Sequence, residues 1–509
     1  MSSDRNVPLA ARFWLFHFFS CVGPEFVVVD PSAQKSSSAL SPPLKADAFR
    51  ADPRIAEAKR LIAEALADHG AGLTDVSAPN PELLPGYDAL LQRLAATRGG
   101  PPFWPYLSAG LGNGPYVELA DGSVKLDFIG GIGVHGCGHS HPAITDAAID
   151  AAIEDTVMQG NLQQHPPSVR ISEKLIQWAT RGGAPLDHCL LSTSGAMANE
   201  NALKIAMHHQ SPADRVIAFD NAFAGRSLAM AALTDRPKYR MGLPLAVNVD
   251  YLPFRDHDNP KRSQQWAVDE LNRLLDRHPG RYAAFWAEPI AGEGGYYPGS
   301  HDFFAALCEP LRKAGIPIIF DEIQSFARTS APFAFQHYGL DHFADIVTVG
   351  KITQVCATLY GKDFVPKGPI LSQTFTGSSS SIAAGMAMLE LLESENCFGP
   401  DGRNMQRQAY FADELDQLSQ KYPSLIHGPF GEGMMIAFTP GDGSFDQAKL
   451  LMDTMYEIGL LGFVCGSDPT RIRFLPPPVS TTNAHIDAAI VLLEQSLNEF
   501  AKKLAAAKS

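Results

Sequence analysis

The 509-residue chain is poor in cysteine, and the cysteines follow no pattern. Seven lie singly along the sequence, and no two are spaced as a Cys-x-x-Cys pair. An odd, scattered set is typical of reduced thiols inside a cell rather than of the disulfide framework of a secreted protein. We therefore expect a cytoplasmic protein.

Positive charge is also in short supply. The chain has 41 Lys and Arg residues against 55 Asp and Glu residues, which gives a formal net charge of −14 at pH 7. A protein of this balance is repelled by nucleic-acid phosphates and by anionic membrane surfaces. We expect neither as a partner, although a local basic pocket remains compatible with the overall charge.

Long hydrophobic runs are missing as well. The most apolar stretches, 13–19 (FWLFHFF) and 26–29 (FVVV), are too short to span a bilayer. The Gly-Pro-Glu at 23–25 interrupts them before any signal-peptide cleavage site, and a Ser/Pro-rich stretch follows at 31–43. We predict that residues 1–45 are a disordered or mis-started extension outside the folded core.

The remaining chain is long enough for a large core in more than one lobe. Helical periodicity, a Pro/Gly-rich loop and a hairpin pattern predict an N-terminal region at 46–143. Strand-like and helix-like segments then alternate over 144–385, as in an α/β protein with a mainly parallel sheet. The predicted strands of this region are 188–191, 216–219, 247–251, 283–286, 316–320 and 345–349. The pattern changes beyond 386, and a smaller α/β domain is expected at 386–509.

Two of the predicted strands end in polar residues of opposite charge. The apolar run at 318–320 is followed by Asp321, and the run at 346–349 is followed by Gly350 and Lys351. Ligands bind at the carboxyl ends of the strands in such sheets, so an acid and an amine should converge on one ligand. An ordinary structural ion pair is the alternative interpretation of these two charges.

The residues around them carry a resemblance to a known family. DEIQ at 321–324 and DIVTVGK at 345–351 resemble the class III aminotransferases, the ω-aminotransferase branch of the fold type I enzymes that use pyridoxal phosphate. The resemblance implies a large domain with a mainly parallel sheet between helices and a smaller C-terminal α/β domain. It also implies that Asp321 keeps the pyridine nitrogen of the cofactor protonated, and that Lys351 forms the Schiff base and shuttles the proton.

Further motifs, in the family's order, imply the rest of the cofactor site. STSGAMANEN at 192–201 is similar to the family's phosphate-binding helix start, AFAGRS at 222–227 to its ring-stacking segment, and AEPIAGEGG at 287–295 to its EPxxGEGG segment. A helix N-terminus suits a phosphate, and an aromatic side chain suits a planar ring. Besides Asp321 and Lys351, the implied cofactor-binding residues are Ser194, Gly195, Ala196, Phe223, Glu288, Gln324 and Thr374. Each of these residues taken singly has another interpretation: 194–196 as an ordinary helix start, Phe223 as a core phenylalanine and Thr374 as a loop threonine.

Two charged residues are implied to bind the substrate. Glu293 would pair with an arginine so that either an ω-amine or an α-carboxylate is accepted, and the partner is Arg473 in RIRFLPP. Arg471 is the alternative if the register differs. Thr374 is the residue that the resemblance places at a phosphate in the partner subunit of a homodimer. The histidines of GGIGVHGCGHSHP lack a Cys or carboxylate at ligand spacing, so we expect no metal site.

Together these features predict a pyridoxal-phosphate-dependent aminotransferase with a ping-pong reaction. The amino donor would be a basic or ω-amino acid of the acetylornithine, ornithine, lysine or 4-aminobutyrate type, and the acceptor a 2-oxo acid such as 2-oxoglutarate. KITQVC at 351–356 is closer to lysine 6-aminotransferases, whereas FAGRS and FLPP resemble ornithine and acetylornithine enzymes. An aminomutase, racemase or decarboxylating enzyme of the same fold, and a non-catalytic binding protein, remain alternatives.

Overall fold

The computed structural model describes residues 44–155 and 158–508 of the chain. Of the predicted extension 1–45, residues 1–43 lie outside the described residues. The chain divides into two units, Met1–Asp52 and Pro53–Ser509. The described part of the first unit holds only the short helix α1 (Lys45–Arg50), and everything below concerns the second unit.

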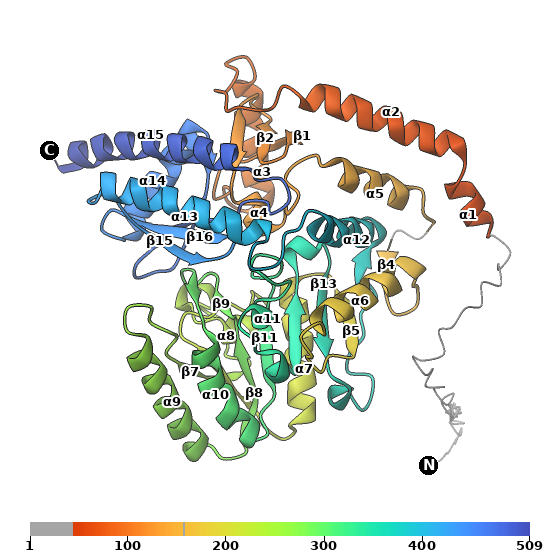
Figure 1. Ribbon diagram of the computed structural model, residues 1–509, viewed down its shortest axis with the longest axis vertical. Coiled ribbons are helices and arrows are strands. Elements are labelled where there is room, and N and C mark those ends of the chain that lie inside the picture. The colour runs from red at the N-terminus through yellow and green to blue at the C-terminus, as the bar shows by residue number, and fades with distance from the viewer. Residues whose placement is uncertain (1–43, 156–157, 509) are drawn as a thin grey trace, which may run out of the picture. The chain divides into compact units, whose positions relative to one another are not determined.

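The second unit is organised around a seven-stranded sheet with the order β5-β13-β12-β11-β8-β6-β7 (Figure 1). Neighbouring strands are parallel except for β13, which pairs antiparallel with both β12 and β5. All six strands predicted for this region are confirmed to within two residues. The strands are β5 (His188–Ser192), β6 (Arg215–Phe219), β7 (Asn248–Leu252), β8 (Tyr282–Ala287), β11 (Ile318–Asp321), β12 (Ile346–Val349) and β13 (Cys356–Tyr360).

Helices cover both faces of this sheet, which explains why its inner strands are largely apolar and buried. Alternate side chains of β11 enter different cores: Ile318 and Phe320 enter one, and Ile319 enters the other. The first core is completed by α6 (Pro166–Ala179), α9 (Pro260–Arg277), α10 (His301–Lys313) and α12 (Ser379–Ser394). The second is completed by α7 (Gly195–His209) and α8 (Leu228–Leu233).

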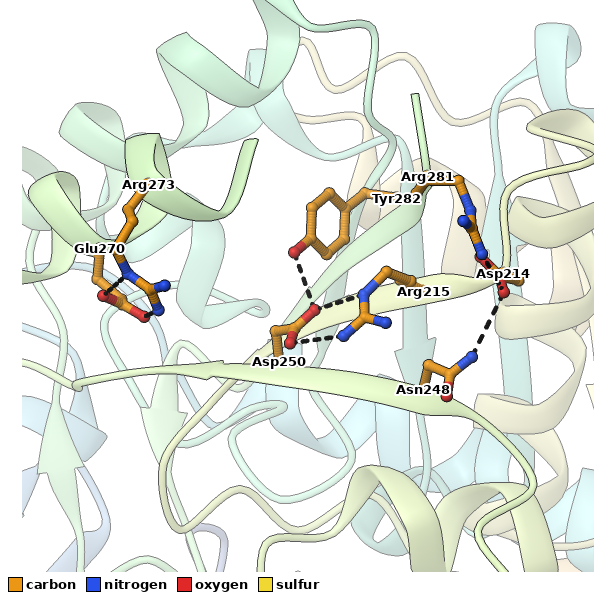
Figure 2. Close-up of polar contacts among 8 residues, drawn as sticks. All are labelled: Asp214, Arg215, Asn248, Asp250, Glu270, Arg273, Arg281 and Tyr282. Atoms are coloured by element: carbon orange, nitrogen blue, oxygen red, sulfur yellow. Dashed lines mark hydrogen bonds and ion pairs between the residues drawn. The ribbon is translucent and has the colours of Figure 1, made fainter. Parts of the chain in front are cut away.

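Ion pairs join three neighbouring strands of this sheet on the side away from the carboxyl ends (Figure 2). Arg215 of β6 donates to both carboxylate oxygens of Asp250 on β7, at 2.8 and 2.7 Å, and the Tyr282 hydroxyl of β8 donates to the same carboxylate. Arg281 pairs with Asp214 just before these strands. Partly exposed pairs of this kind each contribute at most about 1 kcal/mol, so they adjust stability and leave the other end of the sheet free for a ligand.

A second, antiparallel sheet with the order β15-β16-β19-β18 follows in the C-terminal part of the chain. Its strands are β15 (Ile426–Glu432), β16 (Met435–Pro440), β18 (Phe463–Cys465) and β19 (Arg471–Phe474). The helices of this region are α13 (Arg403–Lys421), α14 (Phe445–Ile458) and α15 (Asn483–Lys508). Together they form the smaller α/β assembly that the C-terminal pattern predicts.

The N-terminal sheet packs on that same assembly. The predicted hairpin is observed as β2 (Tyr116–Leu119) and β3 (Val124–Asp127), and β1 (Ser108–Asn113) and β17 (Leu460–Leu461) complete a four-stranded sheet. Its apolar side chains share one core with α13, α14 and α15. The remaining helices of this part are α2 (Pro53–Gly70), α3 (Leu84–Arg98), α4 (Gly130–Gly133) and α5 (Pro142–Ala152).

Short elements complete the second unit: β4 (Met158–Gln159) pairs with β14 (Gly377–Ser378), β9 (Ile290–Ala291) pairs with β10 (Tyr297–Pro298), and α11 is Ala334–His337. Across the described ranges, no helix has both the length and the apolar character to cross a bilayer.

Candidate active site

The site lies where β11 and β12 end. These strands are parallel neighbours, and Asp321 stands in register with Thr348. Lys351 follows two residues after β12 ends, and its side chain lines the same cavity as that of Asp321. This cavity has a volume of about 460 Å³, within the range of small-molecule sites. The structure thus brings the acid and the amine of the sequence analysis together.

A tight backbone reversal positions Lys351. The chain leaves β12 at Val349 and returns in the antiparallel β13, with Val349 opposite Ala357. Within this reversal Lys351 has a φ of 56° and Gln354 a φ of 60°. Left-handed conformations are uncommon for residues other than glycine and often mark functional sites, where the surrounding structure imposes them.

Desolvation sets the protonation of both charged groups. It lowers the pKa of Lys351 to about 8, against the opposing effect of the nearby Glu293 carboxylate. It raises the pKa of Asp321 to about 6, although the Ile323 backbone N–H (2.9 Å) and the Asn199 amide (2.7 Å) both donate to this carboxylate. A cationic ligand group beside Asp321 would supply the missing positive partner and return the carboxyl to its charged form.

One wall of the cavity is the N-terminus of α7. Ser194 caps this helix by accepting a hydrogen bond from the Met197 backbone N–H at 3.2 Å, and Gly195 and Ala196 line the cavity. A Cβ at Gly195 would lie 2.8 Å from Cδ1 of Ile323, so a larger residue would fit there only if the Ile323 side chain moved. The free N–H groups of such a helix start favour an anion, and a phosphate in particular.

Phe223 and Glu288 form an adjoining part of the lining. The Glu288 carboxylate accepts hydrogen bonds from the backbone N–H groups of Phe223 (3.1 Å) and Gly292 (3.0 Å). Burial and the nearby Asp321 raise the pKa of Glu288 to about 8. Glu288 therefore links the segment that carries the aromatic ring to the segment that carries Glu293.

Arg473 reaches the site from β19 of the second sheet. Its guanidinium is fully buried; Nη1 donates to Gln324 Oε1 at 3.0 Å and Nη2 forms an ion pair with Glu293. Among the described residues, its Nε has no hydrogen-bond partner. Arg471 instead donates to the Gly295 carbonyl oxygen (2.6 Å), and its guanidinium lies over an aromatic ring. The arginine paired with Glu293 is thus Arg473 and not Arg471.

Thr374 is the one predicted residue that the structure places away from these groups. Its side chain is exposed, and it is not among the residues that line the cavity. Its predicted role concerned a second subunit, which a single chain does not contain. Thr374 therefore stays a prediction.

Other side chains line the cavity without having been assigned to it from the sequence. Arg226 is exposed at its edge, with the guanidinium 3.5 Å from the centre of the Tyr239 ring. Gln354 donates from Nε2 to the Val134 carbonyl oxygen at 2.8 Å. Arg226 lies three residues after Phe223, and Gln354 three residues after Lys351. This closeness in sequence to assigned residues is the feature from which they could have been predicted. The remaining additions to the lining are Val134, Asn199, Ala224, Gly225, Ile323 and Cys356.

These groups fit pyridoxal phosphate. The helix start at Gly195 suits its phosphate, Asp321 its ring nitrogen, Phe223 its ring face and Lys351 its carbonyl carbon. The fit rests on the close approach of Gly195 to Ile323 and on the buried carboxylate of Asp321. Over 44–155 and 158–508, no group of three or more His, Cys, Asp or Glu side chains is arranged to hold a metal ion.

Comparison with known proteins agrees with this geometry. Residues 105–497 match the sequence model of the family Aminotransferase class-III. An acetylornithine aminotransferase from Methanocaldococcus jannaschii is 31% identical over 405 residues, which cover 77% of this chain and 93% of that protein. An L-lysine-epsilon aminotransferase from Mycobacterium tuberculosis is 29% identical over 412 residues, or 75% of this chain and 89% of that protein.

Solved structures show the same relationship. A lysine aminotransferase from M. tuberculosis superposes with a TM-score of 0.68 at 26% identity, covering 76% of this chain and 93% of that chain. An aminotransferase from Bacillus anthracis has a TM-score of 0.72 at 22% identity and covers 81% of this chain and 99% of that chain; it shows the fold. The family match spans well over half of the chain, and the chain therefore belongs to the class III aminotransferases, pyridoxal-phosphate-dependent enzymes of fold type I.

Proposed function

We propose that the enzyme transfers an amino group from a basic or ω-amino acid to 2-oxoglutarate by a ping-pong reaction. The donor is of the acetylornithine, ornithine, lysine or 4-aminobutyrate type, in keeping with the names of the similar proteins. The observation that carries the proposal is the Lys351 amine, whose pKa is lowered to about 8 in a cavity that also holds Asp321 and adjoins the Glu293–Arg473 pair.

The cofactor supplies the electron sink for this chemistry when bound. Asp321 would hold its ring nitrogen, the N–H groups at Gly195 and Ala196 its phosphate, and Phe223 its ring face. Lys351 is neutral in a larger fraction near neutral pH than an ordinary lysine, because its pKa is about 8. Its Nζ can therefore attack a carbonyl carbon and later accept and return a substrate proton.

The Glu293–Arg473 pair would allow two kinds of substrate into one site. Burial raises the pKa of Glu293, but the Arg473 guanidinium outweighs it and holds this pKa below its ordinary value, so the pair is ionised. With the pair closed, the charge of Arg473 is compensated and an amine end can approach. With Glu293 turned away, the fork of Arg473 can bind a carboxylate. Arg226 provides a second guanidinium, and two guanidiniums suit the two carboxylates of 2-oxoglutarate.

We also propose that the enzyme is a cytoplasmic homodimer in which Thr374 of one chain reaches the phosphate in the site of the other. The exposed position of Thr374 outside its own cavity supports this arrangement. An acid-rich chain with scattered cysteines supports the compartment.

The visible spectrum of the purified enzyme tests the proposal. A yellow protein should lose its colour with one member of a panel of ω-amino and basic amino acids and regain it with 2-oxoglutarate. This result would identify the donor. Turnover without any oxo acid would indicate an aminomutase or racemase instead, and a colourless protein that pyridoxal phosphate cannot reconstitute would contradict the role of Lys351.

A further inference from the structure

Two arginines of strand β19 contact the β9–β10 hairpin that carries Glu293. Arg473 pairs with the Glu293 carboxylate, and Arg471, two residues earlier, donates from Nη1 to the carbonyl oxygen of Gly295 at 2.6 Å. Gly295 in turn lies two residues after Glu293. Residues two apart on a strand share a face, so both arginines reach the hairpin from one face of β19. The contact of Arg471 therefore sets the register in which Arg473 meets Glu293.

The two contacts differ in what the arginine binds. A carboxylate side chain can rotate away from Arg473, whereas a backbone carbonyl can leave Arg471 only if the hairpin itself moves. Two further donors hold the carbonyl oxygen of Glu293: Nη2 of Arg236 at 2.8 Å and the backbone N–H of Gly466 at 2.9 Å. Of these three backbone contacts, only that of Arg471 comes from β19, so it joins the hairpin to the strand of Arg473.

Two aromatic rings fix the guanidinium of Arg471. Its Cζ atom lies 3.6 Å from the centre of the Phe430 ring on β15 and 4.3 Å from the centre of the Tyr297 ring on β10. Arg471 is only 5% exposed, and it forms no ion pair with any residue that the structure describes. A buried charge without an anion lowers stability unless other contacts offset the lost hydration. Stacking on both faces needs a planar cation, which explains an arginine at this position.

We propose that Arg471 is a positioning residue that holds the β9–β10 hairpin against β19 and thereby stabilises the closed pair, in which Glu293 and Arg473 are in contact. This inference rests on the proposed function, which gives that pair its role in admitting both an amine and a carboxylate. Arg471 itself does not line the cofactor cavity. A carboxylate ligand must displace Glu293 from Arg473, so a contact that stabilises the closed pair weakens the apparent affinity for carboxylates.

Binding of glutarate to the holoenzyme reports this equilibrium without turnover. Glutarate has the two carboxylates of 2-oxoglutarate but no keto group and no amine, so it cannot exchange an amino group with the cofactor. Arg471→Met removes the guanidinium and should lower the Kd of glutarate about fivefold in calorimetric titration, which corresponds to about 1 kcal/mol lost from the closed pair. Arg471→Lys keeps a donor for the carbonyl but loses the planar stack, and should lower this Kd about twofold.

A second background tests whether Arg471 acts through Glu293. Glu293→Gln has no carboxylate to compete with the ligand, so it should itself bind glutarate more tightly than the unmodified enzyme. Adding Arg471→Met to Glu293→Gln should then change the Kd by less than about twofold, because the two changes act on the same pair. A merely structural role of Arg471 would change the Kd by the same factor in both backgrounds.

Two further variants keep the test valid if Arg471→Met folds poorly. Tyr297→Leu changes a partly exposed residue, removes one face of the stack and should lower the Kd of glutarate about twofold. Arg407→Met is a matched control that should leave glutarate binding unchanged. It removes an arginine that also donates to a backbone carbonyl, that of Thr481 at 3.2 Å, and that does not line the cavity.

The outcomes separate this inference from the proposed function. The inference alone is overturned if Glu293→Gln tightens glutarate binding and Arg471→Met does not, or if Arg471→Met has the same effect in both backgrounds. If Glu293→Gln binds glutarate no more tightly than the unmodified enzyme, the role of the pair in the proposed function is refuted, and the inference is refuted with it.

Discussion

Removing the charge of Glu293 is the most informative perturbation of the site. Glu293→Gln keeps the size of the side chain and a neutral hydrogen bond to Arg473, but removes the anion that competes with a substrate carboxylate. Arg473 is fully buried, and among the described residues its guanidinium donates to one other side chain, Gln324 at 3.0 Å. A carboxylate that enters the site should therefore gain the full ionic bond to Arg473.

The size of the effect follows from that exchange. A hydrogen bond to a charged group contributes about 1.5–3 kcal/mol and a neutral one about 1 kcal/mol. The interaction of residue 293 with Arg473, which competes with a substrate carboxylate, therefore weakens by about 1–2 kcal/mol. This corresponds to a Kd for glutamate or 2-oxoglutarate that is about five- to thirtyfold lower. The ω-amino donor should bind no better, and more weakly if the uncompensated guanidinium repels its amine. Without substrate, the free energy of unfolding should fall by about 3 kcal/mol, because the buried Arg473 charge loses its anion.

The two half-reactions should be measured separately by absorbance in single turnovers. Glu432→Gln is a matched control, since this carboxylate pairs with His337 at 3.3 Å and does not line the cavity. Equal shifts in the Kd values of the amine and the carboxylate substrates of Glu293→Gln, or no shift in either, would refute the role of the pair in selecting between them.

Three other predictions address the cofactor site. Asp321→Asn should lower kcat by at least about a hundredfold. The matched change Glu322→Gln should lower the melting temperature and leave kcat unchanged. The buried Glu322 carboxylate accepts hydrogen bonds from Ser325 and the Phe335 N–H and does not line the cavity. The second prediction concerns the rate at which colour develops when pyridoxal phosphate is added to the cofactor-free protein. This rate should rise about tenfold per pH unit below pH 8 and level off above pH 8, because the lowered pKa of Lys351 makes its amine neutral above that pH. A rise that continues to pH 10 would contradict this pKa. Lys351→Ala and Thr374→Glu chains should each be inactive, and their equal mixture should regain about a quarter of the original activity through dimers with one intact site; no recovery would argue against a cross-subunit role for Thr374.

Much of the fold could be predicted because the local signals agree with one another. Most of the six predicted strands are short, largely apolar runs, because helices bury both faces of the sheet. Within the N-terminal region predicted from helical periodicity, α3 has Pro85 in its first turn and ends before Gly99, whose φ is 79°. Asp321 and Lys351 could be placed because strand ends of parallel neighbours meet at one edge.

Neither the strand β13 (CATLY) nor its antiparallel direction was predicted from the sequence, although the length of the connection limits the direction. Only six residues separate Val349 from Cys356, and a parallel crossover needs a dozen or more. The choice between Arg471 and Arg473 could not be made locally either. Residues two apart on a strand share a face, and only the packing of β19 against the segment after β8 decides which of them meets Glu293.

The reversal between β12 and β13 also has a kinetic meaning. It fastens the backbone of Lys351 to two central strands of a buried sheet, so only the torsions of the side chain remain free. Under the proposed role, the amine is a tethered reagent confined to a small sphere, and its effective molarity can reach about 10⁵ M or more, as in well-oriented intramolecular reactions. No dissolved amine attains such a concentration. Folding of the sheet has thus already removed the translational freedom that a free base would have to lose at every turnover.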